Sequence, residues 1–306
     1  MPLSDKIRLT LFLTVVGTVY ALSAIVLIRR LWRGGREARW ARLVLGLAAV
    51  GLLCMAYGYW IEPKWLSVTH VRITSAKMKK NARPIRIAYF GDLHSARQPV
   101  LEDRLVEAVA AEKPDLIFFA GDALSETEGL PVFRRCMTRL AAIAPTYGVR
   151  GNWDAEIWEK LDLFGKTGVR ELDGDALPLR VGETEFWLAG VPISGFWRTI
   201  QTLEKVPPGA LTIYLYHSPD EIEEAARRKV DLYCAAHTHG GQVALPFYGA
   251  IITLSKFGKR YESGLYRVDQ TWMYVNRGIG ESGDVAPKVR FCARPELTII
   301  ELAPQP

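Results

Sequence analysis

Two long apolar stretches separate the first 61 residues from the rest of this 306-residue chain. Leu9–Ile28 holds 20 residues without a charge, and Leu43–Ile61 holds 19. At about 1.5 Å of rise per residue, a helix of either length crosses a hydrocarbon core about 30 Å thick. We therefore predict a hairpin of two transmembrane helices over residues 1–61. Two buried core helices would need a polar face nearby, and a cleaved signal peptide has a shorter apolar run.

Beyond a basic connector at residues 62–84, short β-type runs alternate with helical patterns. Strands are predicted at Ile85–Phe90, Asp115–Ala120 and Tyr147–Arg150, with helices near residues 101–112 and 130–143 between them. Such alternation implies parallel strands and an α/β fold. Later strands are predicted at Glu185–Val191, Leu211–Tyr216, Val230–Ala235, Met273–Asn276 and Leu297–Leu302, with a helix at Asp220–Arg228. We expect two packed sheets with helices outside, forming one domain over residues 85–306.

The basic charge of the chain belongs to the predicted hairpin. Residues 1–61 contain eight Lys or Arg and two acidic residues, whereas residues 62–306 contain 31 of each sign. The larger part is therefore neutral overall, which gives no support for a nucleic-acid partner. Between the apolar stretches, residues 29–42 hold six arginines and two tryptophans, a composition suited to lipid headgroups at a membrane interface.

The charge pattern leaves open which side of the membrane the larger part faces. Six arginines between the apolar stretches are opposed by seven Lys or Arg on their outer flanks, so the positive-inside rule does not decide. Beyond the hairpin, Cys136, Cys234 and Cys292 are widely spaced and odd in number. They do not indicate a disulfide framework, and free thiols fit a reducing compartment. We therefore favour a domain that faces the cytoplasm.

Residues with metal-binding side chains follow the predicted strands in both halves of the larger part. In chain order they are Asp92, His94, Asp122, Asn152, His217, His237 and His239. Loops after parallel strands open at one edge of a sheet, so we expect these residues to lie together. Carboxylate, amide and imidazole ligands suit ions such as Mn, Fe or Zn. Two ions about 3.5–4 Å apart can hold a hydroxide nucleophile and clamp phosphoryl oxygens, and Asp122 is the best bridging ligand.

Each of these motifs also has a structural explanation when it is taken alone. The sequence Gly151-Asn152, for example, is a common turn. Their occurrence together, in order and each after a strand, favours the metal site.

The ordered motifs resemble those of the calcineurin-like metallophosphoesterases. They are Gly91-Asp92-Leu93-His94, Gly121-Asp122, Gly151-Asn152-Trp153-Asp154, His217 and Ala236-His237-Thr238-His239. Residues 237–242, 274–280 and 294–297 are similar to segments of a membrane-associated branch of that family. The resemblance covers about residues 85–302 and implies a four-layer αββα sandwich of two mixed sheets.

The resemblance also implies a catalytic centre with two divalent ions, Mn first among the choices. One ion would be bound by Asp92, His94, Asp122 and His239, and the second by Asp122, Asn152, His217 and His237. The expected catalytic residues are Asp122, Asn152, Trp153 and Asp154. Many relatives have a histidine after the motif asparagine that donates a proton to the leaving group, and here that position is Trp153.

Loss of that histidine favours a leaving group that is itself a phosphate. The family includes enzymes that cleave UDP-2,3-diacylglucosamine to lipid X and UMP in lipid A synthesis, and this activity at a bacterial inner membrane is the leading expectation. A broad phosphodiesterase or phosphatase acting outside the cytoplasm is the alternative, and a non-catalytic metal-binding scaffold is a third interpretation. Trp153 would stack on uracil or sugar, or pack at the rim. Arg277 and Arg290 would contact phosphate or brace a loop.

Overall fold

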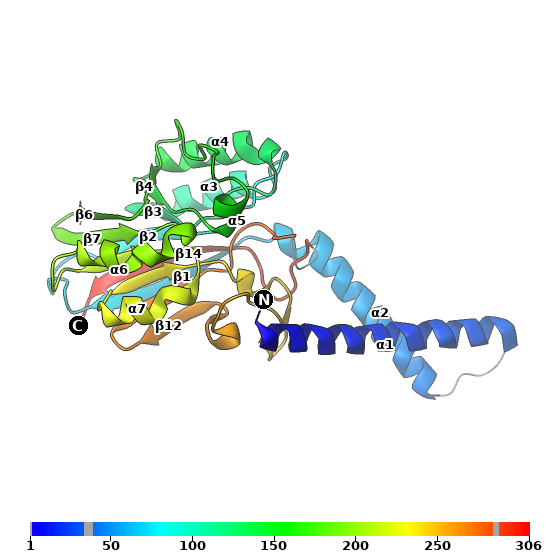
Figure 1. Ribbon diagram of the computed structural model, residues 1–306. Coiled ribbons are helices and arrows are strands. Elements are labelled where there is room, and N and C mark those ends of the chain that lie inside the picture. Colours follow the sequence, from blue (N-terminus) through cyan, green and yellow to red (C-terminus); the bar gives the residue numbers. More distant parts are fainter. Residues whose placement is uncertain (1, 34–38, 284–287) are drawn as a thin grey trace.

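The two apolar stretches form long helices that project away from the rest of the chain (Figure 1). The computed structural model describes residues 2–33, 39–283 and 288–306, in which α1 runs over Leu3–Arg33 and α2 over Arg39–Trp60. Many large apolar side chains on both helices are exposed, and each helix is long and apolar enough to span a membrane. The two predicted helices are confirmed, whereas residues 34–38 of the predicted headgroup-binding loop lie outside the described residues.

Polar side chains on the two helices find hydrogen-bond partners within the hairpin. The hydroxyls of Thr10, Thr14 and Thr18 each donate to the carbonyl oxygen four residues earlier. Between the helices, the Tyr20 hydroxyl donates to the Ala48 carbonyl at 3.3 Å. Because these groups are satisfied internally, they are compatible with an apolar surrounding.

Two six-stranded mixed sheets make up the rest of the fold among the described residues. The first has the order β1-β14-β2-β3-β4-β5, with β1 at Ser67–Ser75, β14 at Glu296–Pro304, β2 at Ile85–Phe90, β3 at Leu116–Phe119, β4 at Thr146–Gly148 and β5 at Arg170–Glu171. The second has the order β12-β13-β9-β8-β7-β6, with β12 at Gly264–Val268, β13 at Thr271–Val275, β9 at Leu232–Ala235, β8 at Thr212–Leu215, β7 at Thr184–Gly190 and β6 at Asp175–Val181. A small antiparallel ribbon joins β10 (Ala244–Leu245) to β11 (Gly249–Ala250).

The directions of the paired strands determine at which edge of each sheet the loops after the parallel strands emerge. Strands β2 to β5 are parallel to one another in the first sheet, as are β7, β8, β9 and β13 in the second. Antiparallel pairs join β14 to β2, β12 to β13, and β6 to β7. The loops that follow the parallel strands therefore leave each sheet at the same edge.

Alternation along the strands produces the layers. In β2, Ile87 and Tyr89 belong to the core between the sheets, whereas Ala88 and Phe90 pack with α3 (Glu102–Glu112) and α4 (Leu130–Ala141). In β8, Leu215 belongs to the inner core and its neighbours pack with α6 (Thr199–Glu204) and α7 (Ile222–Arg227). The expected four-layer αββα sandwich is confirmed (Figure 1).

Strand β1 differs from the prediction that residues 62–84 form only a connector. It pairs in parallel with β14 over nine positions, beginning with Ser67 opposite Glu296. Its even-numbered residues, such as His70 and Arg72, are partly or fully exposed because β1 is an edge strand. This polar face conceals the strand in the sequence, and the first sheet begins at residue 67.

Both ends of the hairpin are bonded to the sheet domain. Glu62, which follows α2 and is 1% exposed, accepts hydrogen bonds from the N–H groups of Cys292 and Ala293 at 3.0 and 2.6 Å. Near the start of α1, buried Asp5 accepts from the N–H groups of residues 253 and 254 at 3.1 and 3.2 Å. The hairpin is therefore packed into the domain at two separate places.

Candidate metal centre

Seven side chains from the carboxyl ends of five strands lie together at one edge of the sandwich. They are Asp92 and His94 after β2, Asp122 after β3, Asn152 at the start of α5 (Asn152–Glu156) after β4, His217 after β8, and His237 and His239 after β9. Asn152 and His237 are half-buried and the other five are buried. Every residue of the predicted ligand set thus belongs to this one cluster.

The loops that carry these residues have an uncommon backbone conformation. Asp92, His94, Asp122, His237 and His239 all have positive φ angles, between 45° and 72°. Non-glycine residues enter this left-handed region at a cost, and they concentrate at functional sites. The surrounding fold therefore holds these five side chains in place against their local backbone preference.

Two glycines allow the loops after β3 and β4 to approach each other. A Cβ atom on Gly121, whose φ is 98°, would lie 2.3 Å from the Gly151 nitrogen. A Cβ atom on Gly151 would lie 2.2 Å from Oδ1 of Asp122. Any larger side chain would push the two loops apart, and Asp122 would leave the cluster.

Acceptor atoms converge around His217. Its Nδ1 lies 2.7 Å from the Ala120 carbonyl oxygen and must donate to it, which directs Nε2 toward the cluster. Nε2 is 3.0 Å from Oδ1 of Asn152 and 3.5 Å from Oδ2 of Asp122. Nδ1 of His237 is also near, at 3.1 Å. Neutral His217 would point a lone pair at these oxygens, so the arrangement calls for a proton or a cation among them.

Each of the two aspartates faces two histidines. Oδ2 of Asp122 lies 3.7 Å from Nε2 of His94 and 3.5 Å from Nε2 of His217. Oδ1 of Asp92 lies 3.8 Å from Nε2 of His239 and 3.9 Å from Nε2 of His217. Two overlapping groups, each with its ligand atoms within 4.8 Å of one another, can hold a metal ion: Asp92 with His94 and His239, and Asp92 with Asp122 and His217.

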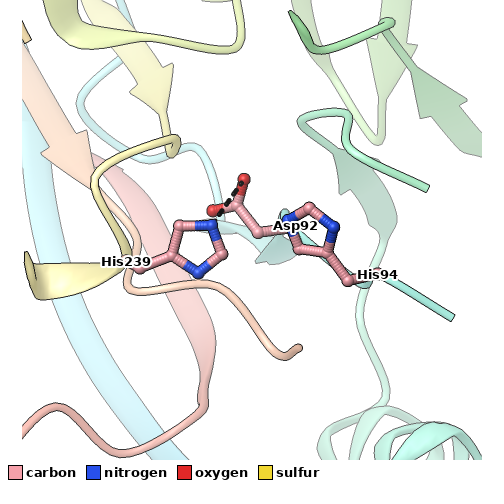
Figure 2. Close-up of side chains that lie close together, drawn as sticks. All are labelled: Asp92, His94 and His239. Atoms are coloured by element: carbon pink, nitrogen blue, oxygen red, sulfur yellow. Dashed lines mark ion pairs between the residues drawn. The ribbon is translucent and has the colours of Figure 1, made fainter. Parts of the chain in front are cut away.

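Three buried polar atoms in the cluster have no hydrogen-bond partner among the described residues. They are Oδ1 of Asp92 and both ring nitrogens of His94. Figure 2 shows Asp92 with the rings of His94 and His239, which stack with their centroids 5.2 Å apart. Buried polar atoms are nearly always satisfied in folded proteins. These orphaned ligand atoms therefore fit a site for divalent metal ions.

Burial and mutual charge set the protonation of the cluster. Burial raises the pKa of Asp92 to about 7, although the nearby His217 opposes the rise. Burial alone would lower the pKa of His217, but the Asp122 carboxylate raises it to about 9. Burial lowers the pKa values of His94 and His237 to about 4, which makes both rings neutral at pH 7. Neutral imidazole is the form that binds metals.

Asp154 holds the loops of the centre together. Its Oδ2 accepts hydrogen bonds from the N–H groups of Asp122 and Gly151 at 2.8 and 2.9 Å, and its Oδ1 accepts from the N–H of Ala123 at 2.9 Å. From the sequence motif, Asp154 is expected among the catalytic residues. Because its carboxylate faces backbone donors and is fully buried, we interpret it as a positioning residue.

Trp153 supplies an aromatic wall instead of a titratable group. Its backbone N–H donates to Oδ1 of Asp122 at 2.9 Å, and its half-buried ring contacts His94. An indole does not titrate near neutral pH, so this position offers no general acid.

Arg290 braces the centre through backbone carbonyls. Its fully buried guanidinium donates from Nη1 to the carbonyls of Arg277 and Ala293 at 3.0 and 2.7 Å, and from Nη2 to that of Gly280. Nη2 also lies 3.5 Å from Nδ1 of His239. Of the two roles that the sequence leaves open for Arg290, phosphate contact and bracing of a loop, these contacts support bracing.

The mixed-sheet sandwich and its strand-end ligands define a metallophosphoesterase. The pattern of the calcineurin-like phosphoesterases matches residues 85–241. Over 277 residues the chain is 31% identical to the phosphodiesterase YaeI of Escherichia coli K12, which covers 85% of this chain and 98% of YaeI. The chain belongs to the calcineurin-like phosphoesterase family. The expected family and hydrolase class are thus confirmed.

Two further relatives span nearly the same part of the chain. YkuE of Bacillus subtilis 168, a metallophosphoesterase, is 29% identical over 280 residues, which cover 85% of this chain and 94% of YkuE. The UDP-2,3-diacylglucosamine pyrophosphatase LpxG of Chlamydia trachomatis serovar D is 21% identical over 321 residues, which cover 85% of this chain and 96% of LpxG. Both matches extend beyond the family pattern, because they cover most of the chain.

Proposed function

We propose that this protein is a membrane-bound, two-metal phosphohydrolase that cleaves the pyrophosphate of UDP-2,3-diacylglucosamine to lipid X and UMP. The observation that carries the proposal is Trp153 beside His94, where a proton-donating histidine would otherwise lie. Without a general acid, a substrate whose leaving group is a phosphate is favoured over one that releases a basic alkoxide. The LpxG relative supports the same substrate class.

The ligands that we propose for the two ions are the seven clustered side chains at the sheet edge. Asp92, His94, Asp122 and His239 would hold one ion, and Asp122, Asn152, His217 and His237 the other, with Mn, Fe or Zn as the metal. Such ions activate water and neutralise charge on the phosphoryl oxygens. The protein keeps His94 and His237 neutral by burial, and Asp154 holds the loop that carries Asp122.

The hairpin would place this centre at a bacterial inner membrane. Two spans return the chain to the side on which it began, so residues 2–8 and the catalytic domain would share one side. The hydrogen bonds of Asp5 to residues 253 and 254 support this arrangement, because they require both parts to be on the same side. We propose the cytoplasmic side, where a nucleotide-linked lipid is made. The proposed division is a hairpin at 1–61, a connector at 62–84 that contributes β1, and a catalytic domain at 85–306.

A broad phosphodiesterase is the second candidate, and the 31% identity to YaeI favours it. Purified full-length protein in detergent with Mn separates the candidates when it is assayed on bis(p-nitrophenyl) phosphate and on UDP-2,3-diacylglucosamine. Release of UMP and lipid X at a kcat/KM well above that for the activated diester supports our proposal. Turnover of the diester alone would favour the broad enzyme, and turnover of neither would favour a metal-binding scaffold.

Membrane sidedness is tested separately with a carboxyl-terminal reporter. Alkaline phosphatase is active only outside the cytoplasm, and green fluorescent protein fluoresces when it is made in the cytoplasm. Fluorescence without phosphatase activity is expected. The reverse result would contradict a cytoplasmic catalytic domain and favour the extracytoplasmic phosphodiesterase.

A further inference from the structure

A cavity of about 180 Å³ lies beside the candidate metal centre. Its lining includes the predicted metal ligand His94 and also Pro63, which comes three residues after the end of α2. One partly open space therefore reaches from the candidate metal centre to Pro63, just after a helix that is long and apolar enough to span a membrane.

The wall of the cavity is mostly apolar. Leu93, Ala96, Val100, Leu101 and Ile279 contribute to it, together with Pro63. Glu102 also lines the cavity, but its carboxylate already accepts hydrogen bonds from the Ser95 hydroxyl and the N–H groups of residues 100 and 101. A carboxylate that is fully engaged leaves the space suited to hydrocarbon.

Two other charged residues give the cavity a polar portion. Glu281 and Lys288 both line it, and Oε1 of Glu281 is buried without a hydrogen-bond partner among the described residues. An unpaired buried acceptor is costly, and a hydroxyl or an amide N–H of a ligand would satisfy it. Apolar walls with a free acceptor and an ammonium group match an amphiphile better than a plain hydrocarbon.

The contacts of the hairpin fix this cavity relative to the membrane side of the domain. Glu62, the residue before Pro63, accepts hydrogen bonds from the N–H groups of Cys292 and Ala293, and these bonds hold the end of α2 against the domain. Three residues after Glu62, the side chain of Trp65 is half exposed, and the guanidinium carbon of Arg294 lies 4.2 Å from the centroid of its ring. An exposed tryptophan with a cation is typical of a membrane interface.

We propose that this cavity binds an acyl chain of the lipid substrate. The chain would leave the bilayer near the end of α2 and lie along Leu101 and Ile279, with the sugar near Glu281 and the phosphates at the metal centre. This inference rests on the proposed function for the identity of the lipid. It adds a binding site, lined partly by Pro63 just after the hairpin, that selects acylated substrates over soluble ones.

Filling the cavity from its rim tests the proposal by activity. Ala96 is half-buried and Val100 is 59% exposed, so Ala96→Trp and Val100→Trp can add bulk with little risk to folding. If the tryptophan side chain excludes two methylenes of the acyl chain from the cavity, the affinity for the lipid falls about 15-fold. We expect the ratio of kcat/KM on UDP-2,3-diacylglucosamine to that on bis(p-nitrophenyl) phosphate to fall by about this factor in both variants. Ala142→Trp, at an exposed position outside the lining, should keep the wild-type ratio.

The two proposals fail in different ways in this assay. Wild-type enzyme that cleaves the lipid nucleotide, with an unchanged ratio in both tryptophan variants, would overturn the cavity site and leave the proposed function intact. Wild-type enzyme that cleaves only the diester would overturn the proposed substrate, and direct labelling then decides the cavity.

Direct labelling needs no turnover. Full-length protein in nanodiscs containing phosphatidic acid with a diazirine on its acyl chain would be irradiated, digested and analysed by mass spectrometry. Label on peptides that contain Leu101 or Ile279, reduced in Ala96→Trp and retained in Ala142→Trp, is expected. Label confined to α1 and α2 would overturn the proposal.

Discussion

The ring of Trp153 packs edge-on against the ring of His94, with their centroids 5.1 Å apart and their planes at 83°. The same tryptophan donates its backbone N–H to Asp122, so its position is set by two members of the proposed ligand set. An aromatic edge with no titratable group therefore lies at the rim of the metal centre. Because no proton donor lies at this position, the rate of hydrolysis should depend strongly on the basicity of the leaving group.

Replacing Trp153 with histidine would place a proton donor at this rim. We expect Trp153→His to raise kcat on an alkyl phosphodiester by about 10-fold or more, because general acids contribute roughly 10²–10⁴-fold when the leaving group is basic. On bis(p-nitrophenyl) phosphate the change should be much smaller. Trp153→Phe keeps the aromatic contact without a proton and serves as the control. Equal gains on both substrates would contradict the assignment.

Removing the charge of Asp122 should disable the centre. Asp122→Asn keeps the shape of the side chain but loses a carboxylate that faces both His94 and His217. We expect at least ~100-fold lower activity and a loss of bound metal, since even residues that only support ligands alter these properties by roughly 10–100-fold. Metal content by mass spectrometry and hydrolysis of bis(p-nitrophenyl) phosphate check both. The exposed Asp269→Asn is the control; full metal content in Asp122→Asn would contradict the ligand assignment.

Asp154 should matter for assembly of the loops. In Asp154→Asn an amide NH₂ would replace one of the oxygens that accept backbone N–H groups, so at least one buried donor would face another donor. The cost is about 2 kcal/mol. We expect a lower melting temperature together with weaker metal binding. If the variant unfolded like wild type and bound metal normally, the positioning role would be wrong.

The end of the hairpin should stabilise the segment around Arg290. Glu62→Ala would leave the N–H groups of Cys292 and Ala293 without their acceptor, at a cost of about 1–3 kcal/mol for the buried N–H of Ala293. Hydrogen exchange followed by mass spectrometry should show faster exchange over 290–294. Glu183→Ala, at an exposed turn, is the matched control. Unchanged protection in Glu62→Ala would mean that these bonds do not hold the segment.

A pH effect on stability is expected from Asp115. Burial would raise its pKa, but hydrogen bonds from Arg83 and from the Arg86 N–H lower the pKa overall, below the ordinary value of 3.8. A depressed carboxyl pKa contributes stability above the unfolded value, and this contribution is lost as the pH falls through the folded value. Asp115→Asn should therefore be less stable than wild type at pH 7, and the difference should begin to shrink near pH 3.8 and vanish only below the lower pKa of the folded state. Because Arg83 is exposed, the effect at pH 7 is about 1 kcal/mol or less.

The positions of the clustered side chains at strand ends could be predicted because short-range spacing determines them. Asp92 and His94 come directly after a buried apolar strand, and Asp122 follows another through Gly121. Once parallel strands are expected, their following loops must share an edge. The two helices of the hairpin could be predicted for a similar reason, because length and apolarity are local properties.

The contacts that join the hairpin to the domain could not be predicted in this way. Glu62 bonds to residues 230 and 231 positions away, and Asp5 to residues 248 and 249 away. Neither acidic residue belongs to a motif. Strand β1 was missed because its pairing with β14 unites the two ends of the domain, and its exposed face carries polar residues. The left-handed backbone at five members of the proposed ligand set is likewise a product of the whole fold.

The acceptor that Glu62 provides has a practical consequence for how the enzyme is produced. A shortened chain that starts at β1 would lack both long apolar helices, but the N–H groups of Cys292 and Ala293 would lose their acceptor and Pro63 would be missing from the cavity wall. Such a chain would expose the Phe291 ring that now packs against Tyr57 on α2. Inhibitors screened against it would meet a surface that the intact enzyme covers with its own helix.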